Sequence, residues 1–234
     1  MRNLGEWAKK AFRGNKGGGM TPENKHQAAV FLDRDGTINE EVGYLDRLEK
    51  LRLVPGAAEA IRLINRSGMK AVVVTNQSGV ARGFFTEAFV DEVHSHLREM
   101  LQEEGASLDG FYFCPHHPTE GRGRYLRSCN CRKPSPGLLL RAIEELSLEP
   151  ERSYMVGDTL KDIEAASRIG ARGILVRTGY GAEAAAVLDT AEGPEQKSPG
   201  NEVRPHGEEV VIRPVHIAGD ILAAVQWLLK DRNP

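Results

Sequence analysis

Two carboxylates, Asp33 and Asp35, directly follow the apolar run Val30-Phe31-Leu32. Side chains two positions apart on an extended backbone project to the same side, so these acids come close together. Their repulsion leaves one of them protonated unless a cation lies between them. A hard divalent ion such as Mg²⁺ is commonly held by one or two carboxylates and a substrate phosphate, and an aspartate can itself attack phosphorus. An isolated Asp-x-Asp-Gly is also typical of a simple polar turn, so the other residues must decide.

Further polar groups follow other apolar runs of the chain or, for the two cations, precede a predicted helix. The candidates, in chain order, are Thr75 and Asn76, then Arg132 and Lys133, then Asp158 with Asp162. Hydroxyl and amide groups suit phosphoryl oxygens, and the cations balance their charge. The two later acids are four residues apart, so a helix that begins there lets both face one ion. Each motif alone is also typical of a cap or a solvated charge, whereas their succession favours phosphate chemistry around a magnesium ion.

The three cysteines of the chain form a second candidate metal site. Cys114 and His116 are separated from Cys129 and Cys131 by twelve residues. An odd number of closely spaced cysteines indicates metal ligation better than a disulfide framework. A tetrahedral Cys₃His set leaves no open position, so we expect one structural zinc loop over 114–131, with His117 as the alternative fourth ligand. The zinc would fix the segment that leads into Arg132 and Lys133.

Short apolar runs alternate with helical patterns from residue 28 onward. Strands are predicted at 28–33, 70–75, 110–114, 153–157, 173–177 and 209–213. Helices are predicted at 57–67, 87–104, 137–146, 160–169 and 217–229. This alternation predicts an α/β fold, a doubly wound parallel sheet with helices on both faces, whose ligands sit beyond the carboxyl ends of the strands. The intervals between the motifs leave no room for a separate cap domain, so loops such as 40–49 and the zinc loop should cover the site.

Composition bounds the class of protein. The 234 residues include 31 Lys+Arg and 33 Asp+Glu, a net charge of −2, which gives no general attraction to nucleic acid. No apolar run approaches the roughly 20 residues of a membrane span, so we expect a cytoplasmic monomer that acts on a small molecule. Residues 1–27 form a basic extension that we expect to be flexible, and 28–234 form the catalytic domain. Within it, 182–208 is interpreted as an exposed insertion.

The succession of motifs resembles a known superfamily. Asp33-Arg34-Asp35-Gly36-Thr37, Thr75-Asn76, Lys133 and Gly157-Asp158 with Asp162 are similar to the four motifs of the haloacid dehalogenase superfamily, over about residues 28–180. Within it, the segment 75–83 and the zinc loop resemble the D-glycero-D-manno-heptose 1,7-bisphosphate phosphatases. The related histidinol-phosphate phosphatases share the zinc loop but differ after their Thr-Asn-Gln.

The resemblance implies a role for each matched residue. Asp33 would be the nucleophile, and Asp35 the acid and then the base. Asp33, the backbone carbonyl of Asp35, and Asp158 would hold Mg²⁺, with Asp162 in support. Thr75 and Asn76 would bind the transferring phosphoryl group, Lys133 would neutralise it, and Arg132 and Arg82 are the nearest cations for a second phosphate. The implied reaction is removal of the 7-phosphate of a heptose bisphosphate. The alternatives are a histidinol-phosphate or other small phosphomonoester phosphatase, or a non-catalytic phosphate-binding zinc scaffold.

Overall fold

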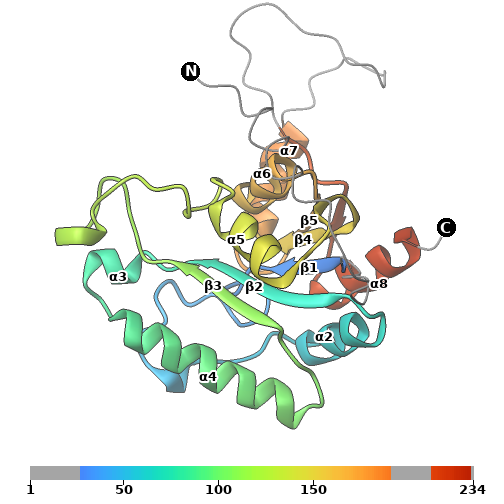
Figure 1. Cartoon of the computed structure of the whole chain (residues 1–234), viewed down its shortest axis with the longest axis horizontal. Coiled ribbons are helices and arrows are strands. Elements are labelled where there is room, and N and C mark those ends of the chain that lie inside the picture. Colours follow the sequence, from blue (N-terminus) through green and yellow to red (C-terminus); the bar gives the residue numbers. More distant parts are fainter. Residues whose placement is uncertain (1–26, 191–211, 233–234) are drawn as a thin grey trace, which may run out of the picture.

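The computed structural model describes residues 27–190 and 212–232, and within them the chain forms a single parallel sheet (Figure 1). The strands are β1 (Ala29–Leu32), β2 (Lys70–Asn76), β3 (Gly110–Cys114), β4 (Tyr154–Gly157), β5 (Arg172–Val176) and β6 (His216–Ala218). Their order across the sheet is β3-β2-β1-β4-β5-β6, and every pair is parallel. All the strands therefore end at the same edge, which is where the candidate residues should meet.

Helices cover both faces of this sheet. They are α2 (Ala57–Arg66), α3 (Gly79–Arg82), α4 (Glu87–Glu103), α5 (Gly137–Leu146), α6 (Leu160–Arg168), α7 (Gly181–Thr190) and α8 (Ile221–Arg232). Short 3₁₀ turns lie at Leu48–Lys50, Gly123–Tyr125 and Pro150–Arg152. One core contains residues of α2, α4 and α8, and another contains residues of α5 and α6. The doubly wound architecture is confirmed.

The first strand shows why the sheet is covered twice. Val30 and Leu32 belong to the core on the α2 side, while Ala29 and Phe31 belong to the core on the α5 side. All four are fully buried. Because successive side chains of a strand point to opposite faces, a continuous apolar run requires a packed layer on each face. This burial fixes the point at which the chain leaves the sheet and the two aspartates begin.

The last strand is not where the sequence predicted it. Residues 212 and 213, the described part of the predicted strand 209–213, are irregular, and β6 is His216–Ala218. The predicted helix 217–229 consequently begins late, as α8 at Ile221. The Asp220 carboxylate accepts a hydrogen bond from the Ala223 N–H at 2.8 Å, which caps this helix start.

The predicted insertion 182–208 is also wrong over its first part. Residues up to Thr190 form α7, with Ala185 and Leu188 buried against Ile163 and Leu175. Ala has the highest helix propensity, and Ala185 and Leu188 lie about one turn apart, so this stretch forms a helix with one packed face. The rest of the insertion, and residues 1–26 of the predicted extension, lie outside the described residues. Within the described ranges, no helix has the length and apolar character that a bilayer crossing requires.

Candidate active site and thiol cluster

A cavity of about 270 Å³ lies at the carboxyl edge of the sheet. It is lined by Asp33 and Asp35 after β1, Thr75 to Gly79 from the end of β2 onward, Arg132 and Lys133 before α5, and Asp158, Thr159 and Lys161 after β4. The loop between β1 and α2 adds Glu41, Gly43, Tyr44 and Leu45, and Phe85 and Tyr180 complete the lining. The structure thus brings together candidate residues from four separate parts of the chain. The predicted cover by loop 40–49 is present.

The Lys133 ammonium lies at the centre of the charged groups. Its Nζ is 2.9 Å from Asp33 Oδ1 and 2.6 Å from Asp162 Oδ1, and it donates to the Val74 carbonyl oxygen at 2.7 Å. Burial alone would lower the pKa of Lys133, but the charges of Asp162 and Asp33 outweigh it and raise the pKa. The residue is therefore a permanent buried cation. Two ion pairs and one hydrogen bond therefore hold the ammonium in place.

Asp33, Asp158 and Asp162 each offer a carboxylate oxygen, and these oxygens lie within 4.8 Å of one another. Burial raises the pKa of Asp33 to about 6. Burial and then the Asp33 charge raise the pKa of Asp158 to about 8. Three carboxylates lie close together, and within the described ranges only the Lys133 ammonium forms ion pairs with them, so the cluster carries excess negative charge. An all-oxygen donor set with excess negative charge fits a hard divalent cation such as Mg²⁺.

Two glycines allow the Asp158 carboxylate to occupy this position. A Cβ on Gly36 or on Gly179 would lie 2.1 Å from Asp158 Oδ2, and both residues have positive φ, +76° and +55°. The same oxygen accepts a hydrogen bond from the Tyr180 N–H at 2.9 Å. The Asp162 carboxylate is held by Thr159, whose N–H and hydroxyl donate to Asp162 Oδ2 at 3.0 and 2.7 Å. The start of α6 therefore fixes Asp162 through its own capping box.

Asp35 has a different environment. The buried Arg34 guanidinium binds both of its oxygens, and Asn39 Nδ2 and Gln77 Nε2 each donate to it at 2.9 Å. Burial raises the pKa of Asp35, but the Arg34 charge and the two amide hydrogen bonds outweigh burial and hold the pKa below its ordinary value. The side chain of Asp35 is not one of the three clustered acids. The two aspartates of the motif thus have pKa values shifted in opposite directions.

Thr75 and Asn76 end β2 and contact different partners. Gln77 Nε2 donates to Thr75 Oγ1 at 2.9 Å, so the Thr75 hydroxyl hydrogen can be donated elsewhere. The Asn76 side chain makes two reciprocal hydrogen bonds with the backbone of Lys133, at 3.0 and 3.1 Å. Its amide therefore clasps the segment that carries the lysine.

The outer part of the lining carries the other cations. Arg132 lines the cavity, and its Nη1 donates to the His116 carbonyl oxygen at 3.3 Å. Arg82, expected from the sequence beside it, instead forms an ion pair with Glu120 and is not among the lining residues. Lys161, which the sequence analysis did not select, does line the cavity and is exposed. The second cation at the cavity is thus on α6 and not on α3.

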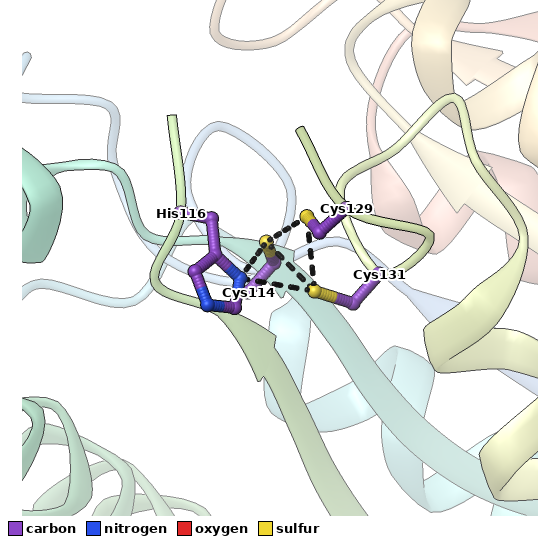
Figure 2. Close-up of side chains that lie close together, drawn as sticks. All are labelled: Cys114, His116, Cys129 and Cys131. Atoms are coloured by element: carbon purple, nitrogen blue, oxygen red, sulfur yellow. Dashed lines mark hydrogen bonds between the residues drawn. The ribbon is translucent and has the colours of Figure 1, made fainter. Parts of the chain in front are cut away.

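The four predicted zinc ligands converge in the structure, as Figure 2 shows. The three Sγ atoms are 3.2 to 3.5 Å apart, and His116 Nδ1 is 3.6 Å from Cys114 Sγ and 3.3 Å from Cys131 Sγ. Zinc–sulfur bonds of 2.3 Å in a tetrahedron place sulfur atoms about 3.8 Å apart, a few tenths of an ångström more than here, so this donor set fits a zinc ion. His117 is not in the cluster, because its Nδ1 accepts the N–H groups of Thr119 and Glu120.

Sequence reasoning missed two residues that contact Asp35. Arg34 is 1% exposed and forms an ion pair with Asp35, and Gln77 contacts both Asp35 and Thr75. The position of Arg34 between two acids in the sequence does not indicate that its side chain is buried. The apolar, buried surroundings of β1 are the only signal, because a fully buried arginine requires a paired acid.

Known proteins are similar to this chain in sequence and fold. A family model described as HAD-hyrolase-like matches residues 130–197. The D-glycero-beta-D-manno-heptose-1,7-bisphosphate 7-phosphatase of Pasteurella multocida is 44% identical over 152 residues, 64% of this chain and 82% of the relative. The protein of that name in Escherichia coli K12 is 44% identical over 157 residues, 66% of this chain and 82% of its own. A crystal structure of D,D-heptose 1,7-bisphosphate phosphatase from B. bronchiseptica, complexed with magnesium and phosphate, superposes with a TM-score of 0.71 at 27% identity, covering 88% of this chain and 99% of the other.

Proposed function

Because this chain belongs to the haloacid dehalogenase-like hydrolases, and within them to the family of the D-glycero-D-manno-heptose 1,7-bisphosphate 7-phosphatases, we propose that it removes the 7-phosphate of that sugar bisphosphate. The observation that carries the proposal is the meeting of Asp33, Asp158 and Asp162 with Lys133 at one edge of the sheet. The reaction would be a step toward nucleotide-activated heptose.

Asp33 is the nucleophile in this proposal. Its Oδ1 accepts hydrogen bonds from the Arg34 N–H and from Lys133, and among the described residues no hydrogen bond to Oδ2 occurs. Lys133 holds one oxygen while the other is left to attack phosphorus and displace the sugar oxygen. The product of this step is an aspartyl-phosphate on Asp33.

Asp35 transfers the protons. In the first step it gives a proton to the leaving sugar oxygen, and in the second it takes one from the water that attacks the aspartyl-phosphate. Arg34 and the two amides hold its pKa low in the free protein, which suits the base role. The negative charge of an arriving phosphoryl group raises the pKa, which suits the acid role.

The remaining residues stabilise the phosphoryl group. The Thr75 hydroxyl donates to a phosphoryl oxygen, and Lys133 balances the charge that develops on it. Asn76 acts through Lys133, because its amide is committed to the lysine backbone. The oxygens of Asp33 and Asp158, with the Asp35 backbone carbonyl, would hold Mg²⁺, and Asp162 would support the site through Lys133. When bound, this ion supplies charge neutralisation between the phosphoryl group and the acids.

The thiol cluster would hold a structural zinc ion. Cys129 and Cys131 directly precede Arg132 and Lys133, and Cys114 ends β3. A zinc ion on this set would tie the loop to the sheet and set the position of Arg132, the cation that we assign to the second phosphate. We take residues 28–234 as the catalytic domain of a cytoplasmic monomer, with residues 1–27 as an extension.

Replacement of the nucleophile tests this function. Phosphate release is measured with both anomers of the heptose bisphosphate, with histidinol phosphate, and with simple sugar phosphates, each with and without Mg²⁺. Asp33→Asn should abolish turnover while the far-UV circular dichroism and the melting temperature stay those of a folded protein. A variant that retains more than roughly a tenth of the wild-type rate excludes Asp33 as the nucleophile.

The alternatives give different results in the same assay. A preference for histidinol phosphate would replace the substrate and leave the mechanism standing. A phosphate-binding zinc scaffold would bind inorganic phosphate and release none from any ester.

A further inference from the structure

Glu41 is an acid on the cavity wall that the proposed chemistry does not use. It lies in the loop between β1 and α2 and lines the cavity with Tyr44 of the same loop and Tyr180, which precedes α7. The residue is half-buried. Burial and then the charge of Asp35 raise the pKa of Glu41, and the Glu41 charge in turn raises the pKa of Tyr180. The Glu41 side chain therefore borders the same cavity as Asp35 and Tyr180.

The other acids of the lining have a source of positive charge. Lys133 pairs with Asp33, and Arg34 pairs with Asp35. Asp158 belongs to the cluster of oxygens that fits a divalent cation. Among residues 27–190 and 212–232, no ion pair includes Glu41, and its carboxylate accepts a hydrogen bond from the Gly43 N–H. A carboxylate has about four acceptor positions, so Glu41 retains capacity for further donors.

A carboxylate without a paired cation weakens the binding of an anionic substrate in the same cavity. It repels each phosphate that enters, and in a partly buried place this repulsion is weakly screened. The cost falls if neutral donors of the substrate reach the carboxylate. The phosphates of a sugar bisphosphate are acceptors, and its hydroxyls are the donors that it offers.

We propose that Glu41 accepts hydrogen bonds from the sugar hydroxyls of the substrate, and so selects polyhydroxylated phosphate esters. The inference rests on the proposed phosphatase function and assigns a specificity residue within it. Arg132 and Lys161 also belong to the lining, so the cavity offers cations for a second phosphate as well as this acceptor for hydroxyls. The substrate then lies with its hydroxyls toward Glu41 and its second phosphate toward the two cations.

The test compares two bisphosphates that differ in their hydroxyls. D-glycero-D-manno-heptose 1,7-bisphosphate is compared with heptane-1,7-diol bisphosphate, which carries both phosphates and no free hydroxyl. The variant is Glu41→Gln, which removes the charge and keeps an oxygen for the Gly43 N–H. The matched control is Glu40→Gln, because Glu40 is the neighbouring acid, is exposed and is not in the lining. The values of kcat and KM are measured at saturating Mg²⁺.

Glu41→Gln should lower kcat/KM for the heptose bisphosphate by about 10- to 100-fold, mainly through KM, because hydrogen bonds to a charged acceptor are lost. The same variant should leave kcat/KM for the diol bisphosphate unchanged or raised, because a repelling charge is gone. Glu40→Gln should leave both values as in the wild type.

Three results would overturn the inference. An equal fall for both compounds would give Glu41 a role in ordering the loop alone. An equal rise would mean that it only repels phosphate, and no change for either would leave it without a role. Failure of the proposed function is recognised separately, because the wild-type protein would then release no phosphate from either compound.

Discussion

Lys133→Met removes the buried cation on which the acids of the site depend. The Lys133 Nζ atom contacts Asp33 and Asp162 at 2.9 and 2.6 Å, and the side chains of Lys133 and Asp162 are 2% and 0% exposed. Methionine has a similar length and leaves two carboxylates without their counter-ion. Breaking a buried ion pair in this way costs about 3–5 kcal/mol. In a protein of this size that is a fall in melting temperature of about 6–20 °C.

Urea unfolding at pH 7 without divalent metal measures this loss. The control is Lys70→Met, which breaks the pair between Lys70 and Asp109 at 2.7 Å, whose side chains are 34% and 24% exposed. Such a pair is worth about 1 kcal/mol or less. Addition of MgCl₂ should restore part of the loss in Lys133→Met, because a divalent cation supplies positive charge to the same oxygens. If the free energy of unfolding of Lys133→Met lies within about 1 kcal/mol of the wild-type value, Lys133 is not the necessary counter-ion of these acids.

Two further predictions concern the thiol cluster and a buried histidine. Cys129→Ser should lower the amount of bound zinc, which mass spectrometry measures. It should also lower turnover of the heptose bisphosphate by more than about tenfold, while the melting temperature changes less. Loss of zinc and of cooperative unfolding with turnover intact would contradict it. Burial lowers the pKa of His94 from 6.5 to about 3, so its contribution to stability is complete above pH 6.5 and is lost as the pH falls toward 3. His94→Phe should therefore flatten the pH dependence of the free energy of unfolding in this range, and an unchanged slope would count against the assignment.

The candidate site was predictable because a parallel sheet collects strand ends. Asp33, Thr75 and Asp158 each follow an apolar run, and topology alone brings them to one edge. The sequence did not predict that Lys161, and not Arg82, lines the cavity. The direction of a long side chain on a loop or helix depends on partners that are distant in sequence. Here the Arg82 guanidinium forms an ion pair with Glu120.

The errors in the fold have local causes. The run before Pro214 has the composition of a strand, but strand composition does not establish pairing, and β5 pairs with His216–Ala218 instead. Asp220 is a good N-cap residue and indicates the start of α8, but the prediction followed the apolar pattern and began the helix at 217. Alanine-rich α7 has little periodicity to read, because alanine packs on almost any face.

The loop that carries the thiol cluster is anchored at both ends, by Cys114 at the end of β3 and by the Asn76 clasp on Lys133. The segment between Cys114 and Cys129 can therefore be exchanged between relatives without disturbing the acids at β1 and β4, provided that the four metal ligands are retained. Chimaeric enzymes built at these two junctions would keep both the chemistry and the choice of sugar of this chain, because no residue from Cys114 to Cys131 lines the cavity. Changes of length or composition inside this segment are therefore expected to leave the reaction intact as long as the metal ligands remain.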